Sequence, residues 1–197
     1  GFVKGVRQVL HADTTPAGYG LADDFVRGVR WLGEKGLSFD LCLRPSDLAD
    51  GVKLSEKCPD TRFILDHCGN GDPKAFHPEL APSEKPWHEV DIWRRGIADL
   101  AKRPNVVCKI SGIVARAPKG WKAEHLSEIV NHCLDSFGPD RVVFGSDWPV
   151  CLLGAPLMVA AADPLAVNTV RPAPHTFTLP AGFTIERVAG PPLVDRP

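Results

Sequence analysis

The feature that most constrains this chain is a regular alternation of short apolar runs with longer amphipathic segments. Five runs are rich in β-branched or aromatic residues, and several are nearly continuously apolar, as strands covered on both faces are. These runs occupy residues 2–10, 37–43, 62–66, 105–110 and 141–145. Helix-like segments lie between them at residues 22–35, 46–57, 90–102 and 123–137. This β-α-β order needs right-handed crossovers, and it predicts a parallel sheet.

The spacing of the strands indicates a barrel-type α/β fold. A complete eight-stranded βα barrel averages about 31 residues per unit over ~250 residues. Five units keep that spacing here but cannot close eight strands, so we expect either an open sheet or a partial (β/α)8 TIM barrel. The alternation stops near residue 153. We therefore expect residues 1–153 to form the partial barrel, and residues 154–197 to be a linker and irregular tail or the start of an unrelated module.

Each helix-like segment has an apolar stripe that predicts its buried face. The residues expected to point inward are Phe25, Val29 and Leu32; Leu48, Val52 and Leu54; Ile92, Ile97, Leu100 and Ala101; and Leu126, Ile129, Val130, Cys133 and Leu134. Between the third strand and the third helix, residues 70–87 form a long polar, proline-rich loop. Loops of that length on a small scaffold are usually functional or disordered.

Composition argues against several classes of partner and compartment. The net charge is −1 and the basic residues are scattered among acids, so neither a nucleic acid nor an anionic membrane is indicated. No stretch approaches the ~20 apolar residues of a membrane span. The six cysteines contain no CxxC pair and most lie in or beside apolar runs, so we interpret them as free thiols of a cytoplasmic protein. The remaining expected partners are a small-molecule substrate and, as an open alternative, further copies of the chain.

Polar residues follow each predicted strand at its carboxyl end, where ligands bind in parallel α/β folds. The candidates for a site at this edge are Arg7, His11, Arg44, His67, Lys109, Asp147 and Trp148. Every strand thus delivers at least one polar or ionisable group to one edge. Such convergence is what an active site on this scaffold requires.

Asp147 and His67 are the two candidates for chemistry. A carboxylate directly after the last strand, two residues before Pro149, can take a proton from water or bind a divalent cation. The alternative for Asp147 is an Asx turn or a helix cap. His67 suits a metal ligand, a general acid or a donor to a substrate carbonyl, and the alternative is a histidine satisfied by the backbone.

The cationic candidates have two interpretations as well. Arg7, Arg44 and Lys109 can clamp a substrate carboxylate or polarise a carbonyl. The alternative for each is an ion pair across the edge of the sheet, with Asp66 or Asp40 as partner. The other histidines of the barrel region are expected on the surface or on helices; these are His77, His88, His125 and His132. No GxGxxG, P-loop, GxSxG or HExxH pattern occurs, so nucleotide-binding and serine-hydrolase functions have no support.

Five motifs in order resemble the amidohydrolase-related (amidohydrolase 2 type) family, in its sugar-lactone hydrolase branch. They are VKGVRQVLH at 3–11, LSFDL at 37–41, FILDH at 63–67, RPNVVCKISG at 103–112 and VFGSDWPV at 143–150. The resemblance implies a (β/α)8 barrel of which these are the fourth to eighth strands. It also implies that Asp147 activates the hydrolytic water, that His67 contacts substrate or metal, and that Arg7 and its neighbours hold the substrate. One divalent ion, zinc or manganese, is an open possibility, because the family includes metal-using and metal-free members.

The chain departs from the family pattern in ways that leave its activity open. The HxH pair of the family's first strand occurs nowhere here, and neither the first three strands nor the closing helix is recognisable. The favoured function is hydrolysis of a lactone by attack of water on the carbonyl. The alternatives are a truncated, non-catalytic fragment of such an enzyme and a metal-assisted decarboxylase of the same superfamily. The DWP and KISG motifs favour the lactonase branch over the decarboxylase.

Overall fold

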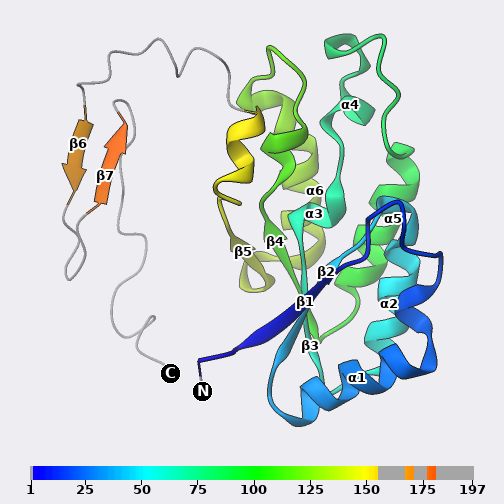
Figure 1. The fold of residues 1–197 in the computed structure, drawn as a ribbon. Helices are drawn as coiled ribbons and strands as arrows, with labels where there is room; N and C mark the ends of the chain where they lie inside the picture. Colours follow the sequence, from blue (N-terminus) through cyan, green and yellow to red (C-terminus); the bar gives the residue numbers. More distant parts are fainter. Residues whose placement is uncertain (1, 155–166, 171–176, 181–197) are drawn as a thin grey trace. The chain divides into compact units, whose positions relative to one another are not determined.

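The computed structural model describes residues 2–154, 167–170 and 177–180, and the first range is built on a five-stranded parallel sheet (Figure 1). Each predicted apolar run contains one strand. The strands are β1 Gly5–Val9, β2 Ser38–Cys42, β3 Arg62–Leu65, β4 Val106–Ile110 and β5 Val142–Phe144. They pair in chain order, each parallel to the next. The prediction of an α/β fold with consecutive βα units is therefore confirmed.

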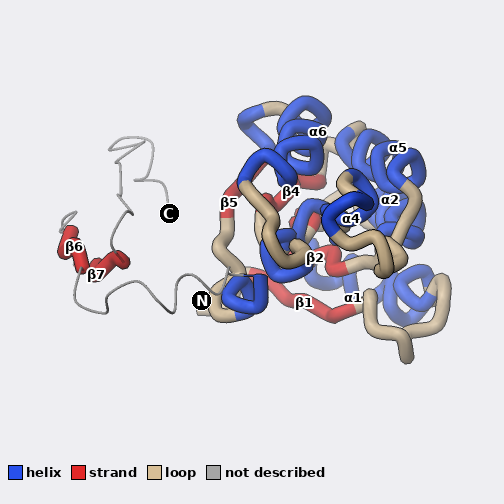
Figure 2. The backbone as a smooth tube through the Cα atoms, turned by 90° about the horizontal axis from the view of Figure 1, so that it is seen from above, coloured by secondary structure: helices blue, strands red, loops and turns tan. Residues whose placement is uncertain are grey.

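Four main helices connect the strands, close to their predicted positions. They are α1 Asp23–Glu34, α2 Leu48–Lys57, α5 Val90–Ala101 and α6 Ser127–Phe137. Figure 2 shows these helices along one side of a curved row of strands. Short helices fill the connections: η1 Tyr19–Leu21, η2 Pro45–Asp47, α3 His67–Asn70, α4 Pro73–Phe76, η3 Pro78–Leu80, η4 Ile113–Arg116, η5 Ala123–Leu126, η6 Pro139–Arg141 and η7 Val150–Gly154.

The core lies between the sheet and these helices, and most of the predicted inward residues belong to it. Two expected positions are wrong. On α5, Ile92 is 49% exposed, while Trp93 is fully buried in its place. On α6, Leu134 is 38% exposed. On α1, Phe25 is partly buried and packs against the core as expected, and Val26 is buried beside it. The strand and helix pattern thus predicted the layers well and the facing of single residues less well.

The two outer strands leave apolar side chains exposed. The exposed side chains are Val6 and Val9 on β1 and Val143 and Phe144 on β5. Phe144 is 81% exposed. β1 and β5 each have one paired neighbour within the described residues, so this sheet does not close on itself. Open apolar edges of this kind are normally covered by further structure.

The remaining predictions about the chain have mixed outcomes. The cysteines are free thiols as expected, five of them buried and Cys151 half-buried. Among the described helices none is both long and apolar enough to cross a membrane. Beyond residue 154, β6 Val167–Val170 pairs antiparallel with β7 Phe177–Pro180. Most of the predicted tail, residues 154–197, lies outside the described residues, so the boundary at 153 stays a prediction.

Candidate active site

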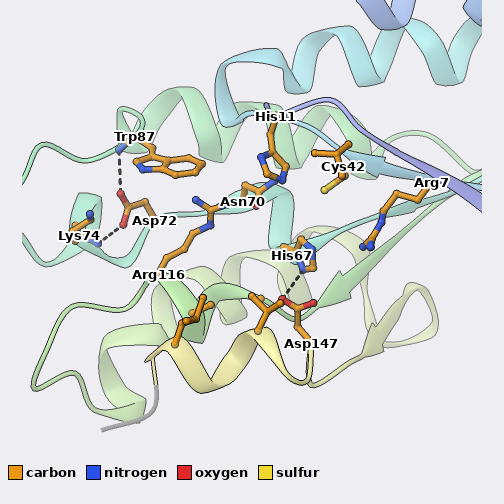
Figure 3. Close-up of a pocket in the computed structure, with 15 residues that line it drawn as sticks. Arg7, His11, Cys42, His67, Asn70, Asp72, Lys74, Trp87, Arg116 and Asp147 are labelled. Carbon is orange, nitrogen blue, oxygen red and sulfur yellow. Dashed lines mark hydrogen bonds and ion pairs between the residues drawn. The ribbon is translucent and has the colours of Figure 1, made fainter. Parts of the chain in front are cut away.

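A cavity of about 580 Å³ opens at the carboxyl-terminal edge of the sheet (Figure 3). Its polar lining comes from Arg7, His11, His67, Asn70, Asp72, Lys74, Trp87, Arg116 and Asp147. Four of the seven predicted site residues are in this set: Arg7, His11, His67 and Asp147. The volume is that of a typical small-molecule site. The edge predicted from the strand ends therefore carries a real cavity.

The backbone after β3 has an unusual conformation that aims His67 into this cavity. His67, Cys68 and Asn70 have φ angles of 55°, 51° and 56°, a left-handed conformation that non-glycine residues rarely adopt. Such residues persist only where their surroundings hold them. Here the Asn70 amide donates to the Leu43 carbonyl at 2.7 Å, and the Trp93 indole donates to the Cys68 carbonyl at 2.9 Å.

His67 and Asp147 come together, as the sequence predicted. His67 Nδ1 lies 3.9 Å from Asp147 Oδ2 and 2.9 Å from Ser111 Oγ. Asp147 also has a left-handed φ of 57°. Gly112 leaves the space that this arrangement needs, because a Cβ at that position would lie within 2.4 Å of His67 Nδ1. The alternative of a backbone-satisfied His67 is not observed, since its Nδ1 faces the side chains of Ser111 and Asp147.

The environment of His67 favours the neutral imidazole. Burial is the largest influence on the His67 pKa and lowers it, while the carboxylates of Asp66 and Asp147 partly oppose that shift. A neutral ring offers one donor and one acceptor nitrogen. His67 can therefore hydrogen-bond either a water or a carbonyl oxygen without carrying charge.

Two of the cationic candidates form the predicted ion pairs. Both pair with Asp66, which is fully buried. Arg7 Nη1 lies 3.4 Å from Asp66 Oδ2, and Lys109 Nζ lies 2.5 Å from Asp66 Oδ1. The Lys109 contact is an ion pair, because its angles are not those of a hydrogen bond. Lys109 is also 3.8 Å from Asp40. Burial raises the pKa of Asp40, and the nearby Asp66 carboxylate adds to the shift. Arg7 still lines the cavity, whereas Lys109 does not, because its ammonium is turned to these acids.

Arg44 and Trp148 are corrections to the predicted set, because neither lines the cavity. The Arg44 guanidinium pairs with Asp47 at 2.6 Å and donates to the carbonyls of Ala12 and Thr15. It therefore holds the loop after β1 in place. The Trp148 side chain is a surface group, 73% exposed.

The cavity residues do not fit a metal ion by themselves. Donor atoms of Cys42, Asp66 and His67 lie within 4.8 Å of one another, and Asp147, predicted with His67 as a metal ligand, is outside this group. Zinc and similar ions need deprotonated thiols and free carboxylates. Asp66 is already paired with two cations, Arg7 and Lys109, so its carboxylate is not free to bind a third. The described residues of this edge therefore do not form a complete set of free metal ligands.

The long loop after β3 and the helix η4 supply residues that the sequence did not single out. The Arg116 guanidinium stacks 3.6 Å from the centre of the Trp87 ring and donates to Asn70 Oδ1 at 3.1 Å. Burial lowers the pKa of His11, and the Arg116 charge adds to that effect. The only signal in the sequence for Arg116 and Trp87 was their position on loops that follow strands.

A buried carboxylate and a buried histidine hold that loop. Asp72 accepts from the backbone N–H groups of Lys74 at 3.0 Å and Trp87 at 3.1 Å. Its own N–H donates to His88 Nε2 at 2.9 Å. His88 is only 8% exposed, so its predicted surface location is wrong. Both ends of the loop are thus joined through Asp72.

We expect the folded protein to lose stability in mild acid, partly through His88. Burial lowers the His88 pKa, and protonation would remove the acceptor used by Asp72. The unfolded chain, with an ordinary histidine pKa of about 6.5, takes up the proton first. The stability from neutral His88 is therefore present above about pH 6.5 and lost as the pH falls. In urea unfolding, the urea concentration at the midpoint should fall between pH 7.5 and pH 5.5, and it should fall less in the His88→Gln variant. An NMR titration that gives His88 of the folded protein a midpoint at or above pH 6.5 would contradict this prediction.

Comparison with known proteins places these observations in a family. A family profile described as amidohydrolase matches residues 2–172. The chain is 34% identical over 158 residues to an L-fucono-1,5-lactonase of Burkholderia multivorans, covering 78% of this chain and 51% of that protein. It is 25% identical over 169 residues to an L-rhamnono-gamma-lactonase of Scheffersomyces stipitis, covering 78% of this chain and 47% of that one.

A solved structure supports the same placement. An amidohydrolase of Burkholderia multivorans, crystallised with bound zinc, superposes with a TM-score of 0.66 at 34% identity, over 80% of this chain and 54% of that one. The chain spans about half the length of the curated relatives it matches. The five-stranded sheet is therefore a partial barrel.

Proposed function

The chain belongs to the amidohydrolase family, and from that membership we propose that it acts on a lactone, the cyclic ester of a sugar acid or a related compound, by attack of water on the ring carbonyl. The observation that carries the proposal is the pair of Asp147 and His67, with 3.9 Å between carboxylate and imidazole, in a small-molecule cavity. The names of two lactonase relatives support the same reaction. The free thiols support a cytoplasmic location.

The chemistry follows from the groups that face the cavity. The Asp147 carboxylate takes a proton from water as the water oxygen attacks the carbonyl carbon. Negative charge then develops on the carbonyl oxygen, and the Arg7 guanidinium is a cation of the lining that can stabilise it. When the ring C–O bond breaks, the leaving oxygen takes the proton back from Asp147, which gives the open hydroxy acid. Neutral His67 orients the water or the carbonyl by hydrogen bonding.

An alternative is that the chain alone is a non-catalytic fragment. The exposed Val143 and Phe144 on β5 favour this reading, because an incomplete sheet leaves the cavity wall incomplete as well. The two hypotheses agree about the site and differ about whether the isolated chain hydrolyses a lactone. They can be distinguished by joining the chain to the N-terminal half that its longer relatives have.

A lactone assay in two forms of the protein tests the proposal. One form is the chain as it stands, and the other is the same chain fused behind the N-terminal half of the Burkholderia multivorans relative. Acid release from a panel of aldonolactones, including L-fucono-1,5-lactone, is followed by pH-stat. We expect clear hydrolysis by the fused form and weak or no hydrolysis by the chain alone. No acid release by a folded fused form would overturn the function, while equal turnover by both forms would overturn the fragment alternative.

A further inference from the structure

Ser111, the residue that follows β4, carries a buried hydroxyl group in contact with His67. Ser111 is only 5% exposed, and its Oγ lies 2.9 Å from His67 Nδ1. Within the part of the chain that the structure describes, this nitrogen is the only hydrogen-bond partner of the hydroxyl. The Ser111 carbonyl accepts from the N–H of Ile113 at 2.8 Å, which fixes the backbone at this point. The imidazole reaches Ser111 across Gly112, where a side chain would displace the ring. The fold therefore holds the two groups together before any ligand arrives.

The direction of this hydrogen bond determines which nitrogen of His67 carries the proton. A neutral imidazole has one N–H group and one nitrogen that accepts, and a hydroxyl has one hydrogen to donate. If Nδ1–H donated to Ser111 Oγ, the hydroxyl hydrogen would be buried without an acceptor among the described residues, which is unfavourable. If the hydroxyl donates to Nδ1, both groups are satisfied and the ring proton is on Nε2. Asp147 does not compete as an acceptor for Nδ1–H, because 3.9 Å is too long for a hydrogen bond.

We propose that Ser111 is a positioning residue whose hydroxyl keeps His67 in the tautomer with the proton on Nε2. The hydrogen bond at one imidazole nitrogen sets the state of the other. Nε2 has no hydrogen-bond partner among the described residues, and the 14% exposed ring lines the cavity, so its N–H is offered to a ligand there. A ring in this form has no lone pair free to take a proton from water, which leaves that role to Asp147. The tautomer is a property of the folded chain, and only its use in hydrolysis rests on the proposed function.

NMR of the chain with nitrogen-15-labelled histidine tests the proposal without any ligand. Long-range proton–nitrogen spectra distinguish a protonated ring nitrogen from an unprotonated one, and the signals missing in His67→Gln identify those of His67. At pH 7.5 we expect the unaltered chain to have the His67 proton on Nε2. In Ser111→Ala a substantial share should move to Nδ1, on the side of the Asp147 carboxylate. Ser111→Thr keeps a hydroxyl and should restore the Nε2 form. The control is Ser127→Ala, at an exposed position of α6 outside the cavity, which should leave the tautomer unchanged.

The outcomes separate this inference from the proposed function. A proton on Nδ1 in the unaltered chain, or a proton that stays entirely on Nε2 in a folded Ser111→Ala variant, overturns the role of Ser111. Circular dichroism confirms that each variant is folded. In the fused form, Ser111→Ala should lower kcat about tenfold with a smaller change in KM, and Ser111→Thr should recover most of the loss. The expected tautomers without lactone hydrolysis in the fused form would retain the role of Ser111 and reject the hydrolase.

Discussion

Replacing Asp147 with asparagine is expected to lower lactone turnover by the fused form about 10³-fold. The amide that replaces the carboxylate has nearly the same shape but cannot take a proton from water. Asparagine also tolerates the left-handed φ of 57° at this position, so the fold should be preserved. Because the substrate-binding cations are untouched, kcat should fall far more than KM changes. Initial rates with the lactone that the pH-stat assay identifies measure both constants.

The matched control for this variant is Asp140→Asn. Asp140 is an exposed aspartate of η6, before β5, and is not part of the cavity lining. We expect its replacement to change turnover less than twofold. If Asp147→Asn keeps most of the activity while its circular dichroism spectrum is unchanged, Asp147 is not the base, and the role assigned to the last strand is wrong.

The layers of the fold could be predicted because strand and helix periods differ so clearly in this chain. The nearly continuous apolar runs at 62–66 and 105–110 are typical of strands in a parallel sheet, and β3 and β4 lie inside them. Which residues of α5 face the core was harder to predict than the position of the helix. Ile92 is as apolar as its neighbours, but its spacing of five from Ile97 turns it about 140° away, whereas Trp93 at a spacing of four shares the buried stripe.

The site was predictable where the backbone alone places a residue. His67 and Asp147 follow their strands by two or three positions, so the direction of the strand takes both to one edge. Arg44 is equally close to the end of β2. Its guanidinium, however, pairs with Asp47 three residues later and does not line the cavity. The left-handed turn at Asp147 leaves Trp148 on the surface.

The residues that were missed act through tertiary contacts. Arg116 lies six positions beyond β4, and in the cavity its guanidinium contacts Trp87 and Asn70, which come from a different loop. No local spacing records such a pairing. His88 was expected on the surface or on a helix, but it is buried and accepts a hydrogen bond from the Asp72 N–H. Sequence patterns therefore indicated the edge of the sheet and not the loops that fold over it.

Replacement of Trp93 by alanine is expected to lower the free energy of unfolding by about 3–5 kcal/mol. The Trp93 side chain is fully buried, and its ring lies 5.4 Å from that of Phe76 and 5.2 Å from that of His132. Its indole N–H also holds the carbonyl of Cys68, inside the left-handed segment that presents His67. Truncation therefore leaves a cavity and releases that segment. Urea unfolding followed by circular dichroism measures the loss.

Two further variants separate packing from hydrogen bonding at this position. Trp93→Phe keeps a buried ring but leaves the Cys68 carbonyl without its donor, so we expect a smaller loss of about 1–3 kcal/mol. Ile92→Ala changes the adjacent, 49% exposed position and should alter stability by about 0.5 kcal/mol or less. A larger loss in Ile92→Ala than in Trp93→Ala would mean that α5 is rotated from the orientation described. The support beneath His67 would then have to come from elsewhere, because no other side chain in the described residues donates to the Cys68 carbonyl.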